Sequence, residues 1–338
     1  MFAQGTVAAV SAPGKVLLAG EYAVLRGTPA LVAAVSRRVV GHVSAGASDG
    51  SPPRAAGSRD SAHFSPEIRL ALARAEAIRN HRLGGPIGMN RAALDHPSGT
   101  KLGLGSSAAQ AVAAAALVFA DAGDDLGSPD IRARVLRAAL DGHRAVAPDG
   151  SGVDVVVSTH GGVLRVERTE DVPVHQDADV PDGLEVSVVW TGVPVRTSGF
   201  VSAVFELEAR DPATFAETMG AVDAAARAFV DAWCGDDAAA VVRATAPHAE
   251  ALRALGDAAG VPIVEARLAR LAVLAAEHGG AAKPSGAGGG DVAVAFFTSR
   301  DARSAFERAA RAESFEPLAL TVGDDGVRRE LAWGGTLS

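Results

Sequence analysis

The stretch that most constrains the fold of this chain runs from His96 to Gln110, HPSGTKLGLGSSAAQ, and continues into the apolar run Ala111–Ala120. Glycine allows a backbone to bend tightly and to lie close to a ligand, and alanine is the strongest helix former. The stretch therefore predicts a glycine loop whose free N–H groups lie at the N-terminus of a helix. Such a terminus attracts phosphate, because its donors are unpaired and the helix dipole is positive there.

Two serines follow the glycines of this loop. Ser106 and Ser107 fall at the first positions of the predicted helix, where a hydroxyl can reach a phosphate oxygen or a phosphate-bound Mg²⁺. The spacing fits neither the Walker pattern, which ends in Gly-Lys-Ser/Thr, nor the dinucleotide fingerprint G-x-G-x-x-G. A glycine-rich loop alone is weak evidence, so a plain structural turn is the alternative interpretation.

Composition excludes several classes of function. The 338 residues carry a formal net charge of −8 without a basic stripe, so we expect no nucleic-acid partner. The single cysteine, Cys234, excludes an intramolecular disulfide, and we expect a buried thiol in a reducing cytoplasm. No basic leader precedes the apolar start, and the run Ala111–Ala120 is too short to span a bilayer. We therefore expect a cytoplasmic monomer or homodimer with no membrane partner.

Lysine is rare in this chain and occurs only at special places. Of the 32 basic residues three are lysines, Lys15, Lys101 and Lys283, and each lies in or beside a glycine-rich stretch. Lysine presents a compact point charge on a flexible stem, whereas arginine presents a broad planar fork. The two are not equivalent at a crowded phosphoryl site, so this distribution favours phosphate chemistry near the three lysines.

Two more glycine-rich stretches carry polar residues that can do chemistry. Asp154 follows Gly150-Ser-Gly-Val, where it either caps a helix or places a carboxylate beside a cleft. The run Lys283-Pro-Ser-Gly-Ala-Gly-Gly-Gly-Asp291 stands between a helix and a buried strand, where a linker is unusual. A plain turn is the alternative there. For Lys15, whose neighbours are apolar, the alternative is a solvated surface lysine.

The hydrophobic pattern predicts a mixed chain whose second half is mostly helical. The polar, acidic segment Asp171–Asp182 suggests a domain boundary, which we place between residues 178 and 179, giving domains 1–178 and 179–338. The expected strands are Thr6–Val10 and Val16–Ala19 with a Pro13-Gly14 turn between them, Ala30–Val35 and Arg38–Ser44 as a hairpin, Val163–Glu167, Leu184–Thr191 and Val292–Phe297. The expected helices, besides the one after the glycine loop, are Pro66–His81, Pro129–Val146, Val201–Ala209, Pro212–Cys234, Asp237–Leu255, Pro262–His278 and Asp301–Ala312.

Three motifs, in this order, closely resemble the signature set of the GHMP kinases. They are Pro13-Gly-Lys-Val-Leu-Leu-Ala-Gly-Glu21, Gly103-Leu-Gly-Ser-Ser-Ala-Ala109 and the Lys283–Asp291 run, and together they span almost the whole chain. The resemblance implies an α+β, two-domain fold: a ribosomal S5 domain 2-like N-terminal domain and a ferredoxin-like C-terminal α/β domain. It also implies Mg²⁺-dependent phosphoryl transfer from ATP to a small molecule bound between the domains.

Within this superfamily the motifs look most like those of the phosphomevalonate kinase family, with Tyr22 where mevalonate kinases commonly place His. The Mg²⁺-binding Glu of mevalonate kinases would fall on His143, which leaves the second metal ligand undefined. The resemblance implies phosphomevalonate and ATP as substrates. A mevalonate kinase or other alcohol kinase of the superfamily is one alternative, and a ligand sensor without catalysis is another.

The resemblance also implies roles for individual residues. Lys15 and Asp154 are expected to be catalytic, and Ser107 is expected to bind the Mg²⁺. The residues expected to bind ATP are Lys101, Gly103, Leu104, Gly105, Ser106, Ser107 and Ala108, and those expected to bind the acceptor are Tyr22, Arg196, Thr197, Lys283, Ser285 and Gly286.

Overall fold

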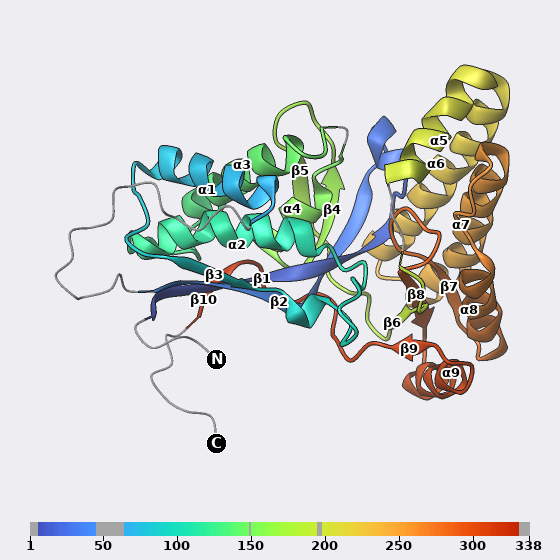
Figure 1. Cartoon of the computed structure of the whole chain (residues 1–338). Coiled ribbons are helices and arrows are strands. Elements are labelled where there is room, and N and C mark those ends of the chain that lie inside the picture. The colour runs from blue at the N-terminus through green and yellow to red at the C-terminus, as the bar shows by residue number, and fades with distance from the viewer. Residues whose placement is uncertain (1–5, 45–63, 149, 195–197, 331–338) are drawn as a thin grey trace.

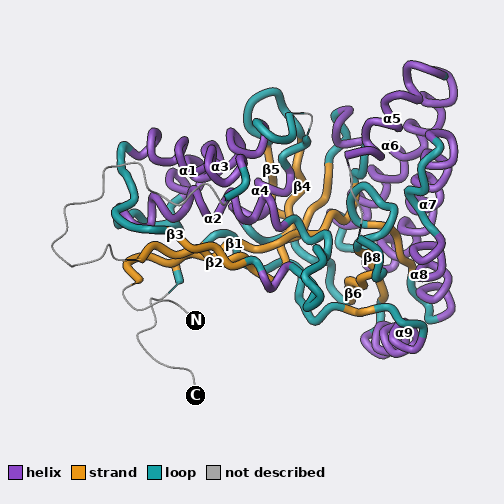
Figure 2. Tube along the Cα trace, viewed as in Figure 1, coloured by secondary structure: helices purple, strands orange, loops and turns teal. Residues whose placement is uncertain are grey.

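The computed structural model describes residues 6–44, 64–148, 150–194 and 198–330. These residues form two lobes, each built from a sheet with helices stacked against it (Figures 1 and 2). The two lobes meet where the ends of the first two strands approach the second sheet (Figure 1). The arrangement is α+β, as the sequence predicts.

The first lobe is an antiparallel sheet covered by helices on one face (Figure 1). Its strand order is β10-β1-β2-β4-β5, and β3 pairs with β2. The strands are β1 (Thr6–Ala19), β2 (Ala30–Ser44), β3 (Ile87–Asn90), β4 (Val163–Glu167), β5 (Val174–Asp177) and β10 (Arg328–Arg329). The helices are α1 (Pro66–Arg79), α2 (Ser106–Asp121), α3 (Pro129–Arg144) and α4 (Val153–His160), and the short 3₁₀ helices are η1 (Ala23–Arg26) and η3 (Ala92–Leu94).

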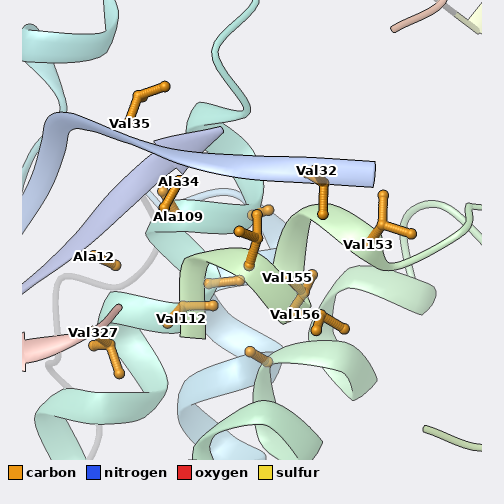
Figure 3. Close-up of a cluster of buried hydrophobic side chains, with 14 of the residues drawn as sticks. Ala12, Val32, Ala34, Val35, Ala109, Val112, Val153, Val155, Val156 and Val327 are labelled. Atoms are coloured by element: carbon orange, nitrogen blue, oxygen red, sulfur yellow. The ribbon is translucent and has the colours of Figure 1, made fainter. Parts of the chain in front are cut away.

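Helix α2 is the centre of the first lobe. Its residues Ala111–Ala120 are all buried, because the helix is packed by β1 and β2 on one side and by α1 and α3 on the other. Figure 3 shows Ala109 and Val112 of this helix among valines of β2 and α4. A helix that is apolar on every side is stable only in such an interior, which explains the alanine-rich run. The glycine loop is thereby fixed to the most buried element of the lobe.

The second lobe has a four-stranded antiparallel sheet in the order β7-β8-β6-β9. The strands are β6 (Glu185–Trp190), β7 (Ala281–Pro284), β8 (Val292–Phe297) and β9 (Glu316–Pro317). The helices are α5 (Ser198–Arg210), α6 (Pro212–Cys234), α7 (Ala238–Ala259), α8 (Ala266–Glu277) and α9 (Arg300–Ala312). After this lobe the chain returns to the first sheet, where β10 pairs with β1. The domain boundary after residue 178 stays a prediction.

Three local expectations are wrong. The Pro13-Gly14 turn is a β-bulge inside the continuous strand β1, and the expected hairpin of residues 30–44 is the single strand β2. Arg38, the first residue of the second expected strand, continues β2; it is buried and donates hydrogen bonds to Ser11 and to Asp324. Cys234, the last residue of α6, is exposed rather than buried.

Across the described ranges, no helix is both long enough and apolar enough to cross a membrane.

Close packing of α1 against α3 gives a test of the first lobe. A Cβ at Gly142 in α3 would lie 2.7 Å from two backbone atoms of α1, the nitrogen of Ala71 and the carbonyl oxygen of Glu67. We therefore expect Gly142→Ala to lower the free energy of unfolding by about 1–3 kcal/mol, measured by urea denaturation. Gly220 in α6 has open space around it, so Gly220→Ala is the matched control and should stabilise by up to about 1 kcal/mol. An equal effect of the two substitutions would contradict this packing.

Candidate active site

A cavity of about 500 Å³ lies between the two lobes. The first lobe contributes the end of β1, η1, the start of the glycine loop and the start of α4, and the second lobe contributes α5 and the loop between β7 and β8. The charged residues that line it are Lys15, Glu21, Asp154 and Asp291. A cleft of this size, with a few convergent polar groups, is the usual form of a small-molecule site.

The glycine loop turns into α2 through two left-handed residues. Gly103 and Gly105 have φ angles of 80° and 72°, a region that glycine adopts without strain, and Gly105 is the N-cap of α2. A Cβ at Gly105 would lie 2.8 Å from Cγ of Lys15, so only glycine permits this close approach. Ser106 and Ala108, which follow, are buried in the first turn of α2.

Lys15 is held directly beneath this loop. Its backbone N–H donates to the carbonyl oxygen of Leu104 over 2.8 Å, and its side chain runs past Gly105 into the cavity. No carboxylate of the described residues lies within 4.0 Å of its ammonium. The structure therefore places a lysine with no described ion-pair partner beside a helix N-terminus, an arrangement suited to a phosphate.

Asp154 faces the same cavity from the first turn of α4. The left-handed Gly152, with a φ of 73°, begins this helix, and Oδ1 of Asp154 accepts from the N–H of Val155 over 3.0 Å. The two sequence interpretations are thus compatible, since one carboxylate lies at a helix start and also beside the cleft. Lys15 and Asp154, which are 139 positions apart in the sequence, line one site.

A polar network next to the cavity was not expected from the sequence. Glu67 of α1 accepts a hydrogen bond from the Ser107 hydroxyl and is bonded to Nδ1 of His143 at 2.7 Å. Nε2 of His143 lies 3.8 Å from Oδ1 of Asp154. The nearby carboxylate of Asp154 and the bond to Glu67 raise the pKa of His143 to about 9 against the effect of burial. His143 is therefore an imidazolium at neutral pH.

Lys283 does not reach the cavity. Its side chain is fully buried, and its ammonium donates to the Glu21 carboxylate and, over 2.8 Å, to the carbonyl oxygen of Pro284. His248 of α7 lies 3.3 Å from the other oxygen of Glu21, and burial together with the Lys283 charge lowers the pKa of His248 to about 2. Lys283 and His248 belong to the second lobe and Glu21 follows β1. This cluster therefore joins the lobes.

Other expected acceptor residues do lie at the cavity. Tyr22, Ser285 and Gly286 all line it. The Tyr22 hydroxyl donates to the carbonyl oxygen of Ala287 over 2.5 Å, and the Ser285 hydroxyl accepts from the N–H of Leu17 over 2.9 Å. Burial and the neighbouring Glu21 raise the pKa of Tyr22, so its hydroxyl stays protonated. Both bonds join the two lobes, and they fix the walls of the cavity.

Of the described residues expected to bind ATP, only Gly103 lines the cavity. Lys101 is exposed, and its backbone pairs with that of Asp95 in an isolated antiparallel β-bridge. It does not line the cavity. Arg196 and Thr197 lie outside the described residues.

Ser107 is the expected Mg²⁺ ligand. The described residues contain no group of three or more His, Cys, Asp or Glu side chains that could hold a metal ion. Ser107 nevertheless offers a hydroxyl oxygen next to the Glu67 carboxylate, and oxygen is the donor that Mg²⁺ prefers. Mg²⁺ commonly takes few ligands from a protein and the rest from substrate phosphates and water. The residues present therefore fit an ion that arrives with a nucleotide.

Sequence reasoning missed Glu67, Glu21, His248 and Asp291 as parts of the site region. Glu21 and Asp291 end the first and third motifs, so the motif boundaries are a signal that could have identified them. Asp291 lies over the glycine loop, because a Cβ at Gly103 would meet its side chain at 2.5 Å. Glu67 and His248 carry no local signal, since each is one of several polar residues in its helix.

Comparison with known proteins identifies the class that this fold and site define. The family model for the C-terminal region of GHMP kinases matches residues 238–316. A phosphomevalonate kinase from Streptomyces sp. strain CL190 is 32% identical over 367 aligned positions, which cover 94% of this chain and 97% of that protein. The chain belongs to the GHMP kinases.

Two further relatives show the range of that family. A mevalonate kinase from Aeropyrum pernix is 33% identical over 219 positions, covering 59% of this chain and 62% of that protein. The structure of a Streptococcus pneumoniae phosphomevalonate kinase with phosphomevalonate and AMPPNP has a TM-score of 0.72 at 18% identity, covering 93% of this chain and 99% of that one. The chain thus has the two-lobed fold of these small-molecule kinases over nearly its whole length.

The buried cluster at Lys283 predicts an effect on stability. Lys283→Met leaves the Glu21 charge buried without its partner. We expect it to lower the free energy of unfolding, measured by urea denaturation, by about 3–5 kcal/mol. The double variant with Glu21→Gln should recover most of that loss, because no charge is then stranded. Arg253→Met removes an exposed ion pair on α7 and is the matched control, expected to cost less than about 1 kcal/mol. A stable Lys283→Met variant with a raised acceptor KM would instead support the substrate role inferred from the sequence.

Proposed function

We propose that the protein transfers the γ-phosphoryl group of ATP to (R)-5-phosphomevalonate, giving ADP and 5-diphosphomevalonate. The observation that carries this proposal is the similarity to a phosphomevalonate kinase over 94% of the chain. In the reaction an oxygen of the acceptor phosphate attacks the γ-phosphorus, and the bond from that phosphorus to the oxygen bridging it to the β-phosphate breaks. The cavity beside the glycine loop supports this chemistry, because Lys15 and Asp154 both line it.

Phosphoryl transfer requires mainly positioning and neutralisation of charge. In the proposed complex the backbone N–H groups of residues Gly103–Ala108 hold the triphosphate, as the start of a buried helix can. Lys15 lies between this loop and the cavity and contacts the γ-phosphoryl oxygens and the acceptor phosphate. Its charge allows two anions to approach each other.

Asp154 orients the reacting groups next to Lys15. A phosphate acceptor has little need of a base near neutral pH, because it already carries negative charge, so Asp154 need not remove a proton. For an alcohol acceptor the same carboxylate would have to act as a general base.

Mg²⁺, when bound with ATP, neutralises charge on the β- and γ-phosphates. Ser107 would hold it, and Glu67 would orient the Ser107 hydroxyl.

The acceptor would lie against the second lobe. Tyr22, Ser285 and Gly286 line that side of the cavity, and we assign Arg196 and Thr197 to the same subsite from the sequence alone. Lys283 is not assigned a contact with the acceptor, because its ammonium is buried against Glu21.

Mevalonate is the second candidate acceptor, because a mevalonate kinase is 33% identical over 59% of the chain. The deciding experiment is ADP release by the purified protein with phosphomevalonate and with mevalonate, measured side by side in a coupled assay. A higher kcat/KM for phosphomevalonate supports the proposal. Activity with mevalonate alone would reassign the protein to alcohol phosphorylation, and nucleotide binding without turnover of either would favour a sensor.

Lys15 provides the first test of this mechanism. Lys15→Met should lower kcat by roughly 10²–10³ while the affinity for ATP changes little, because the ammonium meets charge that develops during transfer. Steady-state kinetics and nucleotide titration measure the two effects. Lys15→Arg keeps the charge but not the compact shape, so its kcat should lie between that of the parent and that of Lys15→Met. Turnover of Lys15→Met within threefold of the parent would show that the assignment is wrong.

Ser107 provides the second test. Ser107→Ala should raise the Mg²⁺ concentration needed for half-maximal activity and weaken binding of MgATP more than binding of the acceptor. A titration of Mg²⁺ at fixed ATP measures this, and Ser98→Ala, in the same loop but bonded to His96, is the matched control. Unchanged Mg²⁺ dependence would place the metal ligand elsewhere.

A further inference from the structure

We propose that Glu67 and His143 are positioning residues for the transfer step: Glu67 holds His143, and the His143 side chain offsets the charge of Asp154 so that an anionic acceptor can approach it. The inference rests on the proposed function, because it takes Asp154 as the carboxylate beside the reacting groups. Glu67 and His143 belong to α1 and α3, two helices that contribute no side chain to the cavity wall.

The first observation is geometric. Glu67 is buried, and its two carboxylate oxygens have different partners: one accepts from Ser107, and the other lies 2.7 Å from Nδ1 of His143. The opposite ring nitrogen of His143 is directed at Asp154, 3.8 Å away. Glu67 thus connects the start of α2, where the triphosphate is expected, through His143 to Asp154.

The second observation is the charge that an acceptor meets. Among the described residues lining the cavity Lys15 is the only Lys or Arg, whereas Glu21, Asp154 and Asp291 are acidic. Glu21 is neutralised by Lys283. An unshielded Asp154 would repel a phosphate acceptor, since like charges at short range in a partly buried site cost several kcal/mol.

The third observation explains why His143 can supply the opposite charge. It is faced by Glu67 from α1 and by Asp154 from α4, whereas Arg144 on its own helix opposes its charge. Gly150 leaves space for the ring, because a Cβ at this position would lie 3.3 Å from Nε2. The bond from Nδ1 to Glu67 keeps the ring oriented toward Asp154.

The test is a double-mutant cycle on kcat and on the KM of each substrate. His143→Gln should lower kcat and raise the acceptor KM, together by roughly 10–100-fold in kcat/KM, with the ATP KM within about threefold of the parent. In an Asp154→Asn background the same substitution should have almost no further effect, because the charge that His143 offsets is gone. His143→Lys retains a cation and should recover part of the loss.

Two controls separate this role from stability and from the choice of substrate. His81→Gln removes a histidine that pairs with Asp121 on the far ends of α1 and α2, and it should leave both KM values unchanged. Thermal unfolding of every variant shows whether a loss of activity is only a loss of folded protein. All kinetics use whichever acceptor the parent phosphorylates, so a wrong substrate assignment does not hide the result. Equal effects of His143→Gln with and without Asp154, or a change in the ATP KM alone, would overturn the proposal.

Discussion

One backbone hydrogen bond organises the site on which the rest of the account depends. The N–H of Lys15 in β1 donates to the carbonyl oxygen of Leu104 in the glycine loop over 2.8 Å. This bond fixes the loop against β1, and β1 in turn packs on α2, whose residues Ala111–Ala120 are all buried. The lysine and the helix N-terminus are therefore placed by the core itself rather than by a mobile loop, as preorganised catalysis requires.

A second constraint keeps the two lobes at a fixed separation. The buried Glu21, Lys283 and His248 cluster joins them below the cavity, and the bonds from Tyr22 and to Ser285 join them at its wall. A buried ion pair contributes little net stability but is costly to break, because the remaining charge is left unpaired. Such a pair defines one arrangement of the lobes, and with it the width of the site. The buried charges next to the site thus set its geometry.

The sequence predicted what depends on local pattern. The helix after the glycine loop, the strand Val292–Phe297 and the helix Pro212–Cys234 are found where hydrophobic spacing and caps placed them. Pairings between distant polar residues could not be predicted from the sequence, because burial of Lys283 or Arg38 depends on partners more than 200 positions away. The same limit applies to Glu67, whose partners Ser107 and His143 come from two other helices. The expectation that Lys283 binds substrate came from its glycine-rich motif. The lysine itself lies in β7, before the glycines, and its side chain is buried.

The most direct measurement of the central claim is a crystal structure of the protein with a non-hydrolysable ATP analogue and phosphomevalonate bound together. We expect the β- and γ-phosphates to lie against the N–H groups of residues 103–108. The acceptor phosphate should lie between the γ-phosphate and the Lys15 ammonium, with Asp154 beside it. Phosphates bound away from the glycine loop, or an acceptor whose phosphate lies remote from Lys15, would contradict it.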